Sequence, residues 1–187
     1  SYIGTATDVV IPAEYNGVPI TQISANCFKG NKEITSVEIP ESITKLDEAA
    51  FHGCTGLKTI TIPGSIENTD NATFYGCTSL ESVKISERVK VIGNSVFRGC
   101  TNLSDVVIPK SVTNIGTFTF WECTSLANVF YGGDESAWAA VTIATKNDSL
   151  TSAIIHYNAT GHTYSTEWTI DVEPTCVLPG SKSIHCT

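Results

Sequence analysis

The chain has 187 residues, of which 41% are hydrophobic and 16% charged, and its formal net charge is −8. This length suits one domain with a small appendage, and an acidic chain without a basic stripe is not expected to bind nucleic acid. No apolar run is long enough to cross a bilayer, so we do not expect the chain to span a membrane. Because the sequence opens on Ser1 and not on methionine, we expect that it is trimmed at this end, so the lack of a signal peptide indicates nothing about export.

The N-terminal region predicts an atypical first coil. A short strand over residues 7–12 ends in Val-x-Ile-Pro, and this ending returns at residues 37–40. Pro12 and Pro40 are 28 residues apart, five more than the repeat that follows, and the excess over residues 13–19 contains turn formers. We therefore expect a capping coil with a longer loop.

A repeat of 23 residues organises the middle of the chain. The phenylalanines that mark it are Phe28, Phe51, Phe74, Phe97 and Phe120. A period of about 20 to 29 residues is typical of a solenoid, in which equivalent residues of successive coils stack. Each repeat has apolar residues at the three positions of the motif Leu-x-x-Ile-x-Ile, here Leu57, Ile60 and Ile62, and the motif ends in the alternation of a half-buried strand.

Proline and glycine mark the predicted corners of the coils. Pro40, Pro63 and Pro109 end three of the strands, because proline cannot donate a hydrogen bond to a ladder. Gly93 and Gly116 follow the last apolar position of their coils, where the conformational freedom of glycine suits a tight corner.

Four cysteines lie on the repeat lattice, at positions Cys54, Cys77, Cys100 and Cys123. Stacked coils lie roughly 5 Å apart, which is close enough for a disulfide, but equivalent side chains point in parallel and this opposes bridging. We predict a ladder of buried thiols that pack as small apolar groups. Cys27, one residue before Phe28, is expected to be buried as well.

Beyond Phe120 the pattern drifts toward a predicted cap. Residues 134–141 indicate a short helix with an acidic first turn, and Trp138 falls 23 residues after Ile115 on the same apolar column. Residues 150–157 repeat the strand motif one residue out of phase. The apolar positions of this last motif are Leu150, Ala153 and Ile155.

Residues 158–187 carry no 23-residue signal and predict a separate small module, too short to hold a core unaided. Cys176 and Cys186 lie there, off the lattice. A disulfide or free thiols are favoured over a zinc site with His162 or His185, because the spacings do not match the usual paired ligands.

The repeat resembles the BspA-like, or Treponema-type, leucine-rich repeats over residues 1–157. The resemblance rests on Phe, Cys, Leu, Ile-x-Ile-Pro and Ile-Gly recurring at one period, as in residues 49–57, 91–100 and 108–116. It implies a secreted or cell-surface bacterial protein with adhesive or protein-binding roles, no enzymatic activity and no cofactor. The predicted fold is an α/β leucine-rich-repeat right-handed solenoid with short parallel strands, 23-residue repeats and little helix. Residues 1–157 would form this solenoid and its two caps.

The outward residues of the strands are the first candidate contact surface, because repeat proteins commonly bind through such a face. We call it the strand face; it consists of Glu38, Thr59, Thr61, Ser82, Lys84, Asp105, Val107, Asn128 and Phe130. Val107 and Phe130 make its C-terminal end apolar, and with Lys84 they are the predicted anchors. A plain solvated sheet face is the alternative.

A second candidate surface follows the phenylalanine column by one residue. It is a ridge of His52, Tyr75, Arg98 and Trp121, preceded by Lys29. Tyrosine, tryptophan and arginine are the usual anchors of protein interfaces. The alternative is a solvated edge.

The predicted function is therefore a non-enzymatic protein-binding or adhesion module. A structural spacer and a carbohydrate-binding module with Tyr75, Trp121 or Trp168 as stacking platforms are the alternatives. No catalytic, cofactor or metal site is predicted, because the four histidines do not recur with a serine or cysteine at a spacing that would form a pocket.

Overall fold

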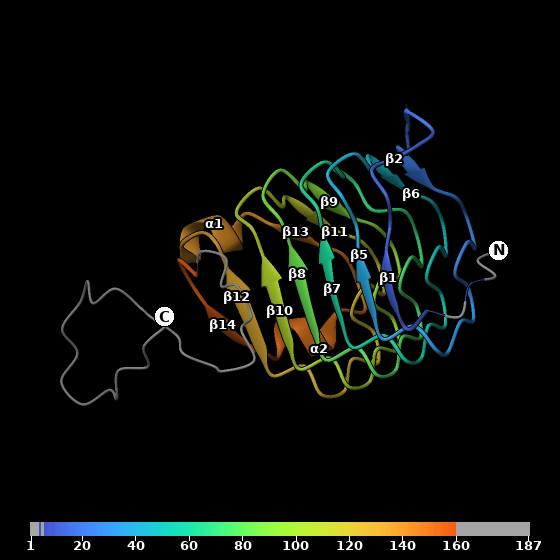
Figure 1. The fold of residues 1–187 in the computed structure, drawn as a ribbon. Coiled ribbons are helices and arrows are strands. Elements are labelled where there is room, and N and C mark those ends of the chain that lie inside the picture. Colours follow the sequence, from blue (N-terminus) through green and yellow to red (C-terminus); the bar gives the residue numbers. More distant parts are fainter. Residues whose placement is uncertain (1–3, 5, 160–187) are drawn as a thin grey trace, which may run out of the picture.

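The computed structural model describes residue 4 and residues 6–159, and these residues wind into a stack of coils (Figure 1). One face of the stack is a parallel seven-stranded sheet in the order β1-β5-β7-β8-β10-β12-β14. Its strands are β1 (Asp8–Val10), β5 (Ser36–Glu38), β7 (Thr59–Ile62), β8 (Ser82–Ile85), β10 (Asp105–Ile108), β12 (Asn128–Tyr131) and β14 (Ile154–His156). The solenoid that the 23-residue period predicts, with short parallel strands and little helix, is confirmed.

The opposite side of each coil carries shorter pairings. They are formed by β4 (Gln22–Ile23) with β6 (Lys45–Leu46), and by β9 (Val91–Ile92), β11 (Asn114–Ile115) and β13 (Thr142–Ile143). Between these two groups, a single bridge joins Asn68 to Val91. The polar segment around Asn68 thus interrupts the second sheet where a coil lacks the apolar strand residues of its neighbours.

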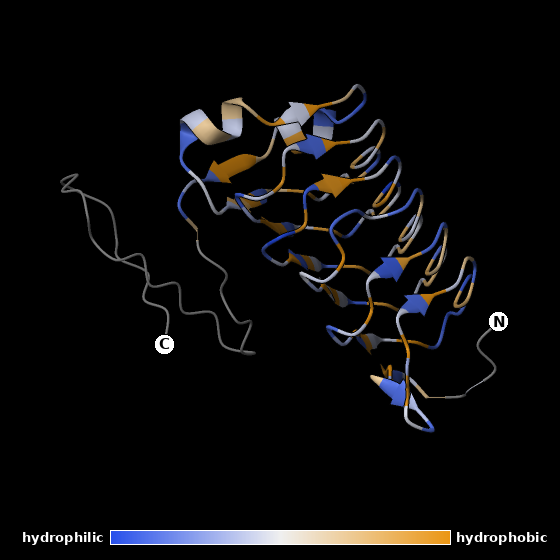
Figure 2. Ribbon diagram, turned by 90° about the horizontal axis from the view of Figure 1, so that it is seen from above, coloured by the Kyte–Doolittle hydropathy of each residue, from blue (hydrophilic) through white to orange (hydrophobic). Residues whose placement is uncertain are grey.

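The core is built from stacked columns, as the repeat predicts. The rings of successive phenylalanines are stacked at centroid distances of 4.8, 5.2, 5.7 and 5.4 Å from Phe28 to Phe120. Seen from above, the coils lie side by side from the N-terminal end to the helix at the other end (Figure 2). The strands pair at an offset of one repeat, as Ile60 with Val83 shows, so each apolar column continues from coil to coil.

The predicted thiol ladder is confirmed. Cys54, Cys77, Cys100 and Cys123 are free and buried. Each thiol donates to the carbonyl of the phenylalanine 26 residues before it, at 3.1 to 3.2 Å, as Cys54 does to Phe28. The predicted burial of Cys27 is wrong, because this thiol is only half-buried. It belongs to the first coil, which has no neighbour on its N-terminal side among the described residues.

Glycine has a different role at the corners than the sequence predicts. Gly93 and Gly116 do not adopt a positive φ. Instead, a Cβ at Gly93 would lie 2.5 Å from the carbonyl oxygen of Thr69, and one at Gly116 would lie 2.7 Å from the backbone of Gly93. These glycines are required by the close approach of adjacent coils.

The left-handed backbone occurs instead two residues before each phenylalanine. Five residues without the freedom of glycine stand there, with φ between 54° and 60°: Asn26, Ala49, Ala72, Ser95 and Phe118. Asparagine is enriched in this conformation, but alanine, serine and phenylalanine are not, and the conformation costs an L-residue about 1–2 kcal/mol. The stack holds them there because their backbone groups bond to the next coil, as the Ala72 amide does to the Asn94 carbonyl at 2.9 Å.

Both ends of the solenoid are modified coils. The longer N-terminal loop forms an antiparallel hairpin of β2 (Glu14–Tyr15) and β3 (Val18–Pro19). Its turn residues Asn16 and Gly17 both have positive φ, as a two-residue hairpin turn requires.

At the other end, the predicted helix is confirmed as α1 (Glu135–Ala139), capped by Asp134, whose side chain accepts a hydrogen bond from the Ala137 amide. The predicted place of Trp138 on the Ile115 column is wrong. Ile143 pairs with Ile115, because α1 lengthens this coil, and Trp138 packs edge-on against Tyr131 at 4.9 Å.

The last coil also differs from the predicted register. A second short helix, α2 (Asp148–Thr151), inserts the fully buried Leu150 into the core. Ile155 then pairs with Val129, and not with Tyr131 as the motif predicts. The helix α2 takes more residues than the corresponding segment of a regular repeat, so the strand β14 begins later in the sequence than a 23-residue repeat would place it.

Candidate binding surfaces

The strand face is only partly accessible. Its N-terminal residues Glu38, Thr59 and Thr61 are exposed, whereas Ser82, Lys84 and Asn128 are half-buried. Asp105, Val107 and Phe130 are buried, with 8%, 4% and 8% of their surface exposed. The predicted apolar anchors Val107 and Phe130 are therefore wrong as exposed contact residues, and so is Asp105.

The last coil explains part of this burial. The ring of His156, on β14, stacks on Phe130 at 4.8 Å, and its Nε2 lies 3.0 Å from the side-chain oxygen of Asn128. The amide of Asn128 in turn donates to Asp105 at 2.9 Å, and the hydroxyl of Ser104 donates to the same carboxylate. At the C-terminal end of the strand face, the polar groups of Asp105 and Asn128 thus have hydrogen-bond partners within the molecule, and the ring of Phe130 is covered.

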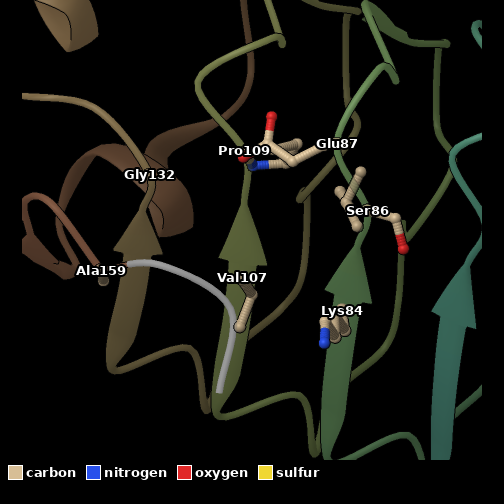
Figure 3. Close-up of a pocket in the computed structure, with 8 residues that line it drawn as sticks. Lys84, Ser86, Glu87, Val107, Pro109, Gly132 and Ala159 are labelled. Atoms are coloured by element: carbon tan, nitrogen blue, oxygen red, sulfur yellow. The ribbon is translucent and has the colours of Figure 1, made fainter. Parts of the chain in front are cut away.

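A cavity of about 240 Å³ lies where the strands β8, β10 and β12 end (Figure 3). Its lining residues are Lys84, Ile85, Ser86, Glu87, Val107, Pro109, Gly132 and Ala159. Pockets for small ligands usually measure about 300–1,000 Å³ and converge several polar groups. Lys84 and Glu87 are the charged side chains of this lining, so the cavity offers few groups for recognition.

The predicted ridge residues are brought together by the structure. The rings of His52 and Tyr75 lie 4.7 Å apart, and the guanidinium of Arg98 lies 5.4 Å from the centroid of the Tyr75 ring. Two residues that the prediction missed complete the arrangement. We call the set the aromatic–basic ridge; it consists of His52, Tyr75, Arg98, Phe118, Trp121 and Lys146.

Phe118 and Lys146 extend the aromatic–basic ridge to the last coil. Phe118 lies 5.5 Å from the Arg98 guanidinium and meets Trp121 edge-on at 5.9 Å. The ammonium of Lys146 lies 5.1 Å from the centroid of the Trp121 ring. Phe118 could have been noticed, because alanine or serine stands at this position in the three preceding repeats. Lys146 lies off the repeat, in the modified coil.

The backbone beneath the ridge is fixed by a ladder of glycine amides. His52, Tyr75 and Arg98 are each followed by a glycine with φ near 70°, such as Gly76 and Gly99. The amide of Gly76 donates to the carbonyl of Arg98 at 2.7 Å, and the amide of Gly99 donates to that of Trp121 at 2.8 Å. The ridge side chains therefore project from a rigid, evenly spaced support.

Arg98 and His52 are electrostatically the most constrained members of the ridge. The Arg98 Nε is buried without a hydrogen-bond partner, and Glu122 approaches it only to 4.0 Å. Burial, with a smaller contribution from the charge of Lys29, lowers the pKa of His52 below its ordinary value. His52 is therefore neutral at physiological pH, and the permanent charges of the ridge are those of Arg98 and Lys146.

Residues 4 and 6–159 contain no group of three or more histidine, cysteine or acidic side chains that could hold a metal ion. Within the same residues no helix has the length and hydropathy needed to cross a membrane. Four side chains considered for a disulfide or zinc, and one considered as a sugar platform, lie outside the described residues. They are Cys176, Cys186, His162, His185 and Trp168.

A family model described as the BspA type leucine rich repeat region matches residues 21–136 in 6 copies. The crystal structure of a T. pallidum leucine rich repeat protein is similar, with 34% identity over 69% of this chain and a TM-score of 0.66. A leucine-rich repeat protein from Eubacterium ventriosum has a TM-score of 0.63 and 22% identity over 88% of this chain.

The similar structures belong to longer chains. This chain spans 60% of the T. pallidum chain and 46% of the Eubacterium ventriosum chain. The pneumococcal vaccine antigen PcpA shares the fold at a TM-score of 0.55 and 15% identity, over 79% of this chain and 43% of its own. No curated protein matches the chain with significance.

Proposed function

The chain belongs to the BspA-type leucine-rich repeat family, and from this membership we propose that it is a non-enzymatic protein-binding or adhesion module of a secreted or cell-surface bacterial protein. We place the contact surface on the aromatic–basic ridge. Repeat proteins present extended surfaces to which successive coils each contribute side chains, and this ridge is such a surface along one edge of the stack.

The observation that carries the proposal is the clustering of half-buried aromatic rings and fixed cations along one edge of the stack. Tyr75, Arg98 and Trp121 are half-buried, so each can add contact area without first losing much side-chain freedom. Interface hot spots are enriched in these three residue types and lie in well-packed surroundings. The exposed part of the strand face, which consists of Glu38 and two threonines, offers no comparable aromatic or arginine anchor.

The alternative of a carbohydrate-binding module is less well supported. A sugar ring stacks on the open face of an aromatic side chain. Arg98 lies over Tyr75, and Lys146 lies over Trp121, so each ring already has a cation on one of the faces on which a sugar could stack. The alternative of an inert spacer predicts that no partner depends on the ridge.

An array experiment separates the three functions. The chain would be applied to purified host and bacterial surface proteins, and in parallel to a glycan array. Tyr75→Ser would be compared with Tyr15→Ser, which changes the same residue type at a site with 69% exposure, away from the ridge. We expect protein signals that Tyr75→Ser weakens about tenfold and Tyr15→Ser leaves unchanged, as expected for a hot-spot residue.

Circular dichroism and thermal unfolding would first show that both variants fold. Protein signals that survive Tyr75→Ser in a folded chain would refute the ridge as the contact surface. Signals on neutral glycans alone would favour the carbohydrate-binding alternative, and silence on both arrays would favour the spacer.

A further inference from the structure

Arg98 is held in an arrangement that is unusual for a surface arginine. Its guanidinium lies 5.4 Å from the centroid of the Tyr75 ring and 5.5 Å from that of the Phe118 ring. With only 34% of its side chain exposed, it is fixed by two rings from neighbouring coils. Such contacts orient a guanidinium before any ligand arrives, so that little entropy is lost on binding.

The charge of Arg98 is only partly balanced by its surroundings. Glu122 lies 4.0 Å from Nε, which is the outer limit of an ion pair and beyond hydrogen-bond distance. Within residues 4 and 6–159, neither terminal nitrogen of Arg98 bonds to an acceptor. Arg88 provides the contrast, because its terminal nitrogen bonds to Glu41 at 3.2 Å although 70% of its side chain is exposed. An oriented guanidinium with unused donors is suited to a carboxylate, which it can bind through two parallel hydrogen bonds.

A second cation lies further along the same ridge. Lys146 covers Trp121, and Trp121 meets Phe118 edge-on. The order along the ridge is therefore Arg98, two aromatic rings, and Lys146. Two cations that flank an apolar contact complement a ligand with acidic groups on either side of an apolar one. The net charge of −8 means that the rest of the chain repels such a ligand.

We propose that the aromatic–basic ridge recognises an acidic segment of a polypeptide partner, with one carboxylate on Arg98, a second on Lys146, and an apolar side chain against Phe118 and Trp121. This inference rests on the proposed protein-binding function and names the chemistry of its partner. A polypeptide is favoured over an acidic glycan because Arg98 and Lys146 each already occupy a face of Tyr75 or Trp121 on which a sugar ring would stack.

The probe for a test is a short poly-L-glutamate, compared with a polygalacturonate of equal length, which presents carboxylates on a sugar backbone. Calorimetry would measure affinity, and the Nε–H resonances of the arginines would show where each polymer binds. We expect polyglutamate to shift the Arg98 resonance and not that of Arg88. Arg98→Gln should weaken binding at least about tenfold, since a hydrogen bond to a charged group contributes about 1.5–3 kcal/mol.

Two further variants separate charge from geometry. Arg98→Lys keeps the charge but not the planar fork, and should still weaken binding about fivefold. Arg88→Gln removes the same charge from another site, and should change binding less than about twofold. Equal losses in Arg98→Gln and Arg88→Gln would overturn the proposal, because the binding would then follow net charge alone.

Tighter binding of polygalacturonate than of polyglutamate would overturn the choice of a polypeptide. Failure of polyglutamate to bind the folded wild-type chain would overturn the anion site itself. These outcomes are distinct from failure of the proposed function, which the Tyr75→Ser array comparison reports without any polyanion. Polyglutamate binding that depends on Arg98 would support the inference even if the arrays identified no natural partner.

Discussion

Replacing Asn147 with alanine tests how the C-terminal end of the solenoid is closed. Asn147 is 3% exposed. Its side-chain oxygen accepts from the Phe120 amide at 2.9 Å, and its nitrogen donates to the carbonyls of Gly116 and Ala144 at 2.9 and 2.8 Å. The equivalent amide one repeat earlier is that of Phe97, and it donates to a backbone carbonyl, that of Thr119 in the following coil. The Asn147 side chain therefore substitutes for backbone at the last phenylalanine.

The expected cost of Asn147→Ala follows from the partners left behind. The Gly116 carbonyl keeps a hydrogen bond from the Thr119 hydroxyl at 2.8 Å. The buried Phe120 amide loses the partner described above, and a buried polar group without a partner costs about 1–3 kcal/mol. The Ala144 carbonyl also loses its partner, but Ala144 is half-buried and water can replace the lost hydrogen bond. We therefore expect the free energy of unfolding to fall by about 1–3 kcal/mol.

Urea unfolding, followed by circular dichroism and tryptophan fluorescence, would measure this change. The matched control is Asn102→Ala, at an exposed asparagine without a side-chain hydrogen bond, which should change stability by less than about 0.5 kcal/mol. Hydrogen exchange would add a local measurement, because the Phe120 amide should exchange faster in the Asn147 variant. A variant as stable as the control, with the Phe120 amide still protected, would refute the capping role.

Three further predictions concern the repeat itself. Ala72→Gly should raise the free energy of unfolding by about 0.5–1 kcal/mol, because it relieves the left-handed strain at φ 54° while adding some unfolded-state entropy. The thiols of Cys54 and Cys123 should not react with Ellman's reagent before unfolding, because burial raises the pKa of each to about 12. Because the pKa of His52 in the folded chain is lower than 6.5, the unfolded chain binds this proton first as the pH falls. Acidification below about pH 6.5 should therefore reduce stability, and His52→Gln should reduce the slope of that loss over the same range.

A specific experimental result would contradict each of these three predictions. A loss of stability in Ala72→Gly, measured by urea unfolding, would show that the left-handed residue is not strained. Thiols that titrate in the native chain would show that the ladder opens. An unchanged pH slope in His52→Gln, measured by unfolding at several pH values, would assign the acid sensitivity to other groups.

The sequence by itself determined the solenoid. Phe51 and its equivalents recur at one period, so the stacking of one coil implies the stacking of the next, and the burial of Cys77 or Leu80 follows from position alone. The alternation along each strand likewise predicts which residues of β7 and β8 face the core. A repeat makes these inferences possible because every coil meets nearly the same neighbours.

Only the tertiary structure decided what happens where the neighbours differ. Phe130 is buried because His156 comes from a coil outside the regular repeat, and Asn147 caps Phe120 from a segment that shares no period with it. Arg98 is held between Tyr75 and a phenylalanine at a position where other coils carry alanine or serine. These contacts depend on distances between side chains of different coils, and a periodic pattern contains no information about departures from itself.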